Sequence, residues 1–465
     1  MTRAALVLLA ALVAACAPLP RPPRPAAPPW QPRGSVGVGP VRPGSMKRHG
    51  RWWLAVGSHP LDVVMVAAMR GNPSLAEAAA RARVAAAELR LTRAGGRPHL
   101  SARGRTTAER FSRNGLHGPV NGQSLLYTEV DPLVGRWHLT EFGRVDDEVR
   151  AAFGAAQAAK AGRAWARLMV AAQVTRTYFA AEAVREERAC WTALRRDARG
   201  RVVLARIRRR EGVGGARAVY ASEEALAAAD QGYRKAATSL VRLRDALGAL
   251  AGRGPAFGRH VALGALPGPA RLPLPSVIPL ALVARRPDVV AARRLVAAAA
   301  ARAGAARAAF YPDVNIAFFA GWNSISLGDL FNPANLAHAI GPIVTLPIFE
   351  GGTLRAGLAR QDAAFTMARA RYQGVLVGAV REVADRVARW RRVRRDLRTQ
   401  TQAVRAAYRQ EALAGQAFRS GLTSRAPLLN ADRAWWRERL RAIALQEAQA
   451  ATWVDIEEAI DGQAG

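Results

Sequence analysis

Leu346-Pro347-Ile348-Phe349-Glu350-Gly351-Gly352 ends a strand-like run and opens the longest helical pattern in the chain. From Leu354 to Leu397, large apolar side chains recur at steps of three, four or seven residues. Such a stripe, kept for about six heptads, is typical of a coiled coil. It predicts one helix from Gly352 to Gly421, roughly 105 Å long at about 1.5 Å per residue. A single helix of that length cannot hide its apolar stripe, so we expect antiparallel partner helices in the same and in neighbouring chains.

The first half of the chain repeats the landmarks of the second half in the same order. Pro73 and Pro98 are 25 residues apart, as are Pro287 and Pro312, and each pair brackets a run rich in alanine and arginine. Proline is favoured in the first turn of a helix and just beyond its end. The two proline pairs therefore predict two equivalent helices.

Two shorter landmarks repeat as well. Residues 137–144 share a phenylalanine and a glycine with residues 346–352, and glycine-containing breaks occur at 212–215 and 421–424. Each half thus reads as helix, strand, strand, long helix, turn and long helix. The predicted fold is mostly α with a small β part, in which long antiparallel coiled-coil helices are internally duplicated beside four β-strands per chain.

The strand signals are modest. Residues 100–108 and 314–319 alternate between the two faces of a strand, and loops rich in glycine and asparagine follow the first of them. After the N-terminal signal there is no apolar run long enough for a transmembrane helix. Four strands cannot close a barrel, and open sheet edges cannot lie in lipid, so we expect closure to require several chains.

The N-terminus has the pattern of a secretory signal. Arg3 precedes an apolar stretch at residues 4–15, which is too short to span a bilayer. The sequence Leu-Val-Ala-Ala before Cys16 resembles a bacterial lipobox, whose cysteine is acylated, for example with palmitate. Ordinary signal cleavage with Cys16 as a bystander is the alternative. Residues 17–45 are rich in proline, glycine and arginine, and they predict an extended tether.

Four segments follow from these features. We expect a lipoprotein signal peptide at 1–15, the acylated Cys16 and its tether at 16–50, a first repeat at 51–260 and a second repeat at 261–465. The second cysteine, Cys190, has no internal partner, and we expect it to be a small buried apolar residue.

The charge is strongly positive, with 69 basic residues against 35 acidic ones and a net charge of +34. One interpretation is a polyanionic partner such as nucleic acid. The other is a solvated surface built from arginine, which the even spread of arginines along the chain favours. We therefore expect no nucleic-acid partner.

The sequence contains no arrangement typical of catalysis. Its seven histidines are scattered without metal-ligand spacing. No serine or cysteine nucleophile motif and no phosphate-binding loop is present. The chain is therefore predicted not to be an enzyme and to bind no metal or cofactor.

Taken together, several pieces resemble the TolC-like outer-membrane efflux protein family, specifically the NodT-type lipoproteins of resistance-nodulation-division efflux systems. The similarity runs from Trp52 to Gly462, and its most specific pieces are Arg286-Pro287-Asp288, residues 137–144, residues 347–352, and Asn72-Pro73 with its helix. The resemblance implies a homotrimer whose strands form one twelve-stranded barrel in the outer membrane and whose helices form a tunnel across the periplasm. It also implies a periplasmic adaptor (membrane fusion) protein and an inner-membrane pump as partners, with outer-membrane lipid around the barrel.

The resemblance assigns the helix-turn-helix tips to the periplasmic mouth of the tunnel, where the family often carries aspartates after the turn glycine. This chain departs from that pattern, because Arg217 and Arg425 are present and Asn430 stands where a carboxylate is expected. Rings of charge set pore selectivity, so one hypothesis is an entrance that prefers anions. The alternative is that these arginines face the adaptor. The candidate tip and gate residues are Gly212, Arg217, Phe418, Gly421, Thr423, Arg425 and Asn430.

Three functions remain in competition. The first is passive efflux of small molecules, such as drugs and toxic compounds, through an outer-membrane duct. The second keeps the fold but exports proteins by a type I system, or metal ions. The third is a basic coiled-coil protein that binds polyanions, which the signal sequence and the duplicated strands disfavour.

Overall fold

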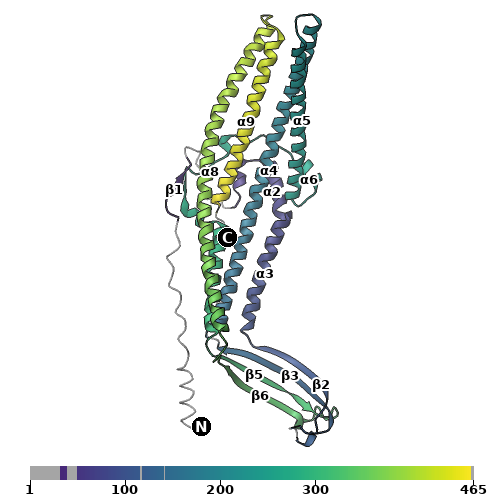
Figure 1. The fold of residues 1–465 in the computed structure, drawn as a ribbon, viewed down its shortest axis with the longest axis vertical. Coiled ribbons are helices and arrows are strands. Elements are labelled where there is room, and N and C mark those ends of the chain that lie inside the picture. Colours follow the sequence, from purple (N-terminus) through teal and green to yellow (C-terminus); the bar gives the residue numbers. More distant parts are fainter. Residues whose placement is uncertain (1–31, 39–49, 116–117, 141, 462–465) are drawn as a thin grey trace.

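The protein is an elongated molecule with a β-sheet at one end and two helical hairpins at the other (Figure 1). The computed structural model describes residues 32–38, 50–115, 118–140 and 142–461. The predicted signal peptide and Cys16 lie outside the described residues, so both remain predictions.

The helices and strands follow the predicted order. The α-helices are α2 (His59–Gly71), α3 (Pro73–Gly95), α4 (Arg144–Arg210), α5 (Ala216–Leu250), α6 (Pro255–Arg259), α7 (Pro287–Ala308), α8 (Thr353–Arg419) and α9 (Arg425–Ile460). The strands are β1 (Ser35–Gly37), β2 (His99–Arg110), β3 (Ser124–Thr140), β4 (Val277–Pro279), β5 (Asp313–Ser324) and β6 (Leu336–Thr345). Short 3-10 turns include η1 (Trp52–Val56) and η4 (Leu280–Arg285).

Two long helices, α4 and α8, form the backbone of the molecule. Each has 67 residues, which corresponds to roughly 100 Å at about 1.5 Å per residue. Their partners are about half as long, with 35 residues in α5 and 36 in α9. These partners pair with α4 and α8 on the side away from the sheet, and α3 and α7 pack along the other half (Figure 1). The predicted helix between Gly352 and Gly421 is confirmed.

Local signals explain where the shorter helices begin. Asn72 caps α3, and its side chain accepts a hydrogen bond of 2.9 Å from the backbone N–H of Ser74. Pro73 and Pro287 occupy the first positions of α3 and α7, where a missing N–H costs nothing. The two equivalent helices predicted from the proline pairs are therefore confirmed.

The four main strands form one antiparallel sheet in the order β2-β3-β5-β6. The alternating segments at 100–108 and 314–319 lie within β2 and β5. The central pair, β3 and β5, joins the two halves of the chain, because β3 belongs to the first repeat and β5 to the second.

The main hydrophobic core lies near mid-length, where the long helices meet the segments that connect the two halves. Trp52 and Trp453 pack edge to face with ring centroids 5.4 Å apart, and both are almost completely buried. Trp390 of α8 is buried in the same cluster. The Trp453 indole N–H donates to the carbonyl of Pro273 at 3.0 Å, which satisfies its polar atom.

Part of the predicted tether belongs to this folded body. Residues 35–37 form β1 and pair antiparallel with β4 at 277–279. Val38 is fully buried, and Arg391 of α8 donates to the carbonyl of Gly37. Within the predicted tether at 16–50, residues 35–38 thus pack on the folded body. The sequence did not show this, because strand pairing with a segment 240 positions away leaves no local signal.

Candidate functional site

The sheet has one polar face, which is built from ion pairs between β2 and β3. Arg103 contacts Asp131 at 3.2 Å, and Arg105 contacts Glu129 at 3.0 Å. Tyr127 donates its hydroxyl hydrogen to Glu129 at 2.9 Å. The pairs are cross-strand neighbours in the register of the sheet, and such pairs stabilise a sheet while presenting charge to one side only.

The opposite face of the sheet is apolar and exposed. Leu100, Phe318 and Ile340 lie in one row across the strands, and Ile340 is 76% exposed. Gly135 stands in this row, where a side chain would come within 2.0 Å of the Phe318 ring. The glycine therefore lets the ring lie over the strand. An apolar face of this kind is unusual on a protein surrounded by water, and it indicates a non-aqueous or protein neighbour.

The two outer strands of this sheet, β2 and β6, each have a partner on one side only within the described chain. Unpaired strand edges bind further strands readily. No helix in the described part of the chain is both long and apolar enough to cross a bilayer.

The other end of the molecule consists of two tips with the same turn. Gly212 follows α4 with φ +73°, and Gly421 follows α8 with φ +70°. In each turn the next residue donates back to the helix, from Val213 to Arg208 and from Leu422 to Ala417, both at 2.9 Å. This is the closure of a Schellman motif, which requires a left-handed residue at the glycine. The two glycines predicted for the turns therefore occupy equivalent positions.

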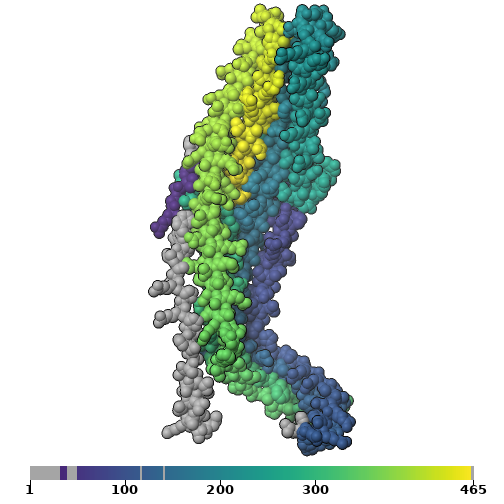
Figure 2. Space-filling view, in the orientation of Figure 1, coloured from purple at the N-terminus to yellow at the C-terminus, as the bar shows by residue number. Residues whose placement is uncertain are grey.

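The structure brings the predicted tip residues to the ends of the two hairpins, which form separate lobes in the space-filling view (Figure 2). Arg217 lies in the first turn of α5 and Arg425 opens α9, and both are exposed. Phe418 is 38% exposed, Thr423 is half-buried and Asn430 is exposed. No contact in the structure tests a gating role for these residues, so that role remains a prediction.

The tips are strongly positive. Neither α5 nor α9 has an acidic residue in its first turn, and α4 ends with three consecutive arginines at 208–210. Arg217 and Arg425 make no ion pair with another described residue. A basic residue at a helix N-terminus is disfavoured by the helix dipole, so the structure gives these two side chains no stabilising role within the chain.

The two hairpins contact one another below their tips. Arg201 of α4 donates to the backbone carbonyl of Leu429 in α9. Beside this contact lies a cavity of about 360 Å³, whose wall includes Arg208 and Asn430. Asn430 is therefore the one predicted tip residue that the structure places between the hairpins.

Sequence reasoning missed a buried ion-pair network that joins the helices near mid-length. Arg286, which is 2% exposed, binds Asp288 at 2.8 Å and Glu382 at 3.0 Å. Arg176 of α4 binds Asp455 at 2.8 Å and also contacts Glu458 of α9. The motif Arg286-Pro287-Asp288 was the only sequence signal of this network, and its role is to fix the start of α7 against α8.

A second missed cluster holds the segment that links the two repeats. Glu182 of α4, 2% exposed, accepts a hydrogen bond from the backbone N–H of Gly264 at 3.0 Å. Arg185 donates to the Gly264 carbonyl, and Glu186 accepts from the N–H of Leu266 at 3.3 Å. Burial raises the pKa of Glu182 to about 7, against hydrogen bonds that lower it. Among the described residues no group of acidic, histidine or cysteine side chains could hold a metal ion.

Comparison with known proteins identifies the family. Residues 64–253 and 278–462 match the family described as outer membrane efflux protein. The multidrug resistance outer membrane protein MdtP of Escherichia coli K12 is 28% identical over 383 residues, which cover 81% of this chain and 78% of MdtP.

Two solved structures show the same architecture. The outer membrane protein VceC of Vibrio cholerae matches with a TM-score of 0.79 and 25% identity, over 89% of this chain and 98% of VceC. The outer membrane channel CmeC of Campylobacter jejuni matches with a TM-score of 0.84 over 96% of this chain and 95% of CmeC, and at 18% identity it supports the fold alone. The chain therefore belongs to the outer membrane efflux protein family, and it is an outer-membrane protein with the fold of a channel subunit rather than an enzyme.

Proposed function

We propose that the chain is one protomer of a homotrimeric duct in a tripartite efflux system. In this proposal small molecules, such as drugs and toxic compounds, arrive from an inner-membrane pump of the resistance-nodulation-division class through a periplasmic adaptor protein. They leave passively through the trimer, and the pump supplies the energy. The helices extend into the periplasm.

The observation that carries the proposal is the sheet with two unlike faces. Its apolar row, in which Leu100 and Ile340 are exposed and Phe318 is half-buried, suits lipid. Its ion-paired face at Arg103–Asp131 and Arg105–Glu129 suits a water-filled lumen. Three copies joined through the free edges of β2 and β6 would remove every open strand edge. The roughly 100 Å helices would then continue the lumen away from the membrane.

The efflux function is tested by removing the gene and measuring the retention of an ethidium dye in cells. Loss of the chain is expected to raise dye retention, and the wild-type gene is expected to restore export. A Phe318→Asp variant is expected to fail to restore export. The charge that it adds to the apolar row should prevent insertion into the membrane, so dye retention should stay high. Unchanged retention in the deletion strain, in cells shown to contain no second duct, would contradict the proposal.

We also propose that Cys16 carries the lipid anchor. The supporting observation is the lipobox-like sequence that ends at Cys16. Palmitate labelling is expected to mark wild-type protein in the outer-membrane fraction and to fail for Cys16→Ser. Equal labelling of both proteins would exclude this site of acylation.

The arginines of the tips support a third element of the proposal, an entrance that favours anions. Arg217 and Arg425 are exposed, and neither is neutralised by a described residue of the same chain. In planar bilayers with a salt gradient, the reversal potential of the wild-type channel should indicate a preference for anions. In the double variant Arg217→Gln/Arg425→Gln the reversal potential should shift in the direction of cation preference. A cation preference of the wild type would contradict this element and favour an adaptor-facing role for the two arginines.

A further inference from the structure

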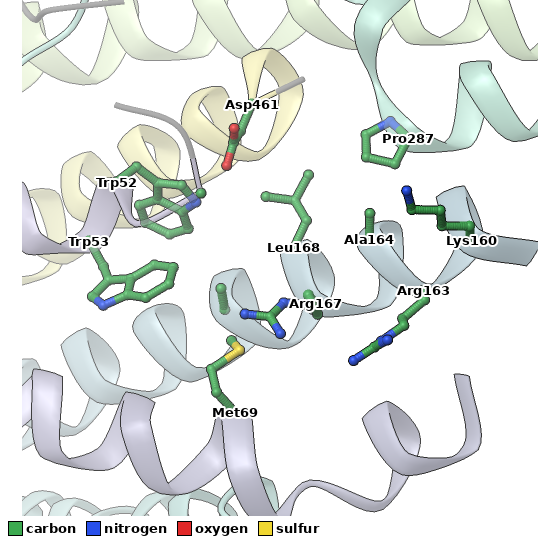
Figure 3. Close-up of a pocket in the computed structure, with 12 residues that line it drawn as sticks. Trp52, Trp53, Met69, Lys160, Arg163, Ala164, Arg167, Leu168, Pro287 and Asp461 are labelled. Atoms are coloured by element: carbon green, nitrogen blue, oxygen red, sulfur yellow. The ribbon is translucent and has the colours of Figure 1, made fainter. Parts of the chain in front are cut away.

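A cavity of about 240 Å³ lies near mid-length, far from both the sheet and the tips (Figure 3). It is bounded by η1, by residues 160–171 of α4, by Met69 of α2, by the start of α7 and by Asp461 just after α9. Trp53 and Leu168 give it apolar walls, and both side chains are less than 10% exposed. The cavity is thus close to the main core and lies away from the sheet and from the tips.

One face of α4 gives the cavity three positive charges. Lys160, Arg163 and Arg167 all line it, and their spacing of three and four residues places them on a single helix face. In Figure 3 they extend from α4 around the cavity, with Lys160 beside Pro287. All three are exposed, and none makes an ion pair or a side-chain hydrogen bond with another described residue. In contrast, Arg176 on the same helix is fully engaged by carboxylates.

The described residues that line the cavity carry less negative than positive charge. Asp461 is the one carboxylate among the described lining residues, against three cations. Residues 16–50 contain no aspartate or glutamate.

The cavity wall also holds an unused hydrogen-bond donor. The indole N–H of Trp52 is buried and has no acceptor among the described residues, although buried donors are nearly always paired. Leaving such a donor unpaired is unfavourable. Unpaired cations, an unpaired donor and apolar walls together describe a site for a molecule that has both a negative group and an apolar body.

We propose that this cavity binds a small organic anion. Arg163 and Arg167 hold its carboxylate or phosphate group, since guanidinium groups bind such oxygens through paired hydrogen bonds. The apolar part of the ligand lies against Trp53 and Leu168. This proposal does not depend on the transport path proposed above.

The test uses the full-length protein in detergent and two probes of nearly equal shape, 2-naphthoate and its uncharged amide, 2-naphthamide. Titration calorimetry is expected to show saturable binding of 2-naphthoate and binding of 2-naphthamide that is weaker by about tenfold or more, the factor expected when charge-assisted hydrogen bonds are lost. Equal affinities for the two probes, or no saturable binding of 2-naphthoate, would overturn the proposal.

Two double variants locate the site. Arg163→Gln/Arg167→Gln is expected to weaken 2-naphthoate binding by about tenfold or more. Arg83→Gln/Arg90→Gln, which removes two exposed arginines of α3 that also lack ion pairs, should leave affinity unchanged. Trp52→Phe, which replaces the indole by a smaller aromatic ring and removes the N–H, should give a smaller loss.

A different occupant would produce a different result. If the arginines bind acidic side chains of a neighbouring copy, Arg163→Gln/Arg167→Gln will lower the native mass of the assembly, and the wild type will not bind 2-naphthoate. That outcome overturns the ligand site. If Arg163→Gln/Arg167→Gln and Arg83→Gln/Arg90→Gln lose affinity equally, binding depends on the overall surface charge and not on this cavity. That result would also overturn the proposal.

Discussion

The link between the two repeats is expected to loosen as pH rises, because one buried carboxyl group holds it. Glu182 is 2% exposed and accepts the N–H of Gly264 at 3.0 Å. Burial is the main cause that raises its pKa to about 7, from an ordinary value of 4.5. When the linking segment opens, water reaches Glu182 and its pKa falls back toward the ordinary value.

The sign and size follow from proton linkage. Between pH 4.5 and 7 the closed state keeps a proton on Glu182 that the open state releases, so closure weakens as pH rises through this window. Closure is fully favoured below about pH 4.5. A difference of roughly 2.5 pKa units corresponds to at most about 3 kcal/mol. Because Glu182 stays on α4 when the link opens, we expect the free energy of closure to change by about 1–3 kcal/mol over this pH window.

Hydrogen–deuterium exchange of the peptide spanning residues 260–267 measures this closure. After correction for the intrinsic pH dependence of exchange, protection is expected to fall from pH 5 to pH 8 in the wild type. Glu182→Gln, which cannot ionise, should remove the dependence, and Glu88→Gln at an exposed position of α3 should keep it. Protection that rises with pH, or an unchanged slope in Glu182→Gln, would refute the reasoning.

Three further predictions concern stability and reactivity. Arg286→Ala should destabilise the protein by about 2–3 kcal/mol, as measured by thermal unfolding. Breaking a fully buried ion pair costs ~3–5 kcal/mol, and we expect less here because the Glu382 side chain is 44% exposed. By the same measurement Gly421→Ala should cost about 1 kcal/mol, since its left-handed backbone lies in open space. Gly252→Ala should cost clearly more, because its side chain would come within 1.8 Å of the Gly71 carbonyl oxygen; equal losses for the two glycines would contradict this. Burial raises the pKa of the Cys190 thiol to about 11, so a thiol reagent at pH 8 should label it only after unfolding, and rapid labelling of native protein would refute its burial.

Most of the fold could be predicted from the sequence because its signals are local. The stripe from Leu354 to Leu397 specifies a long helix through contacts between residues three and four apart. Pro73 and Pro287 mark helix starts by their own backbone restrictions, and Gly212 and Gly421 mark turns through the left-handed conformation that they allow. Repetition of these signals in both halves predicted the duplication.

The candidate site was predictable only in part. The sequence placed Arg217, Arg425 and Asn430 at the tips, but the direction in which a side chain points there depends on the neighbouring hairpin. It likewise placed strands in both halves without showing that β3 and β5 would join them into one sheet. Strand order depends on contacts between distant segments, which leave little trace in the local pattern.

The long paired helices, the internal duplication and the four main strands follow from local sequence signals, because turn residues and apolar periodicity act over a few positions. Tertiary packing, in contrast, joins residues 35–37 to the strand at 277–279 and brings Glu182 to the link at Gly264. It alone decided that three cations of α4 gather around a cavity beside Trp52. These arrangements depend on which distant surfaces are buried together, since burial determines which charges must be paired and which remain available to a ligand.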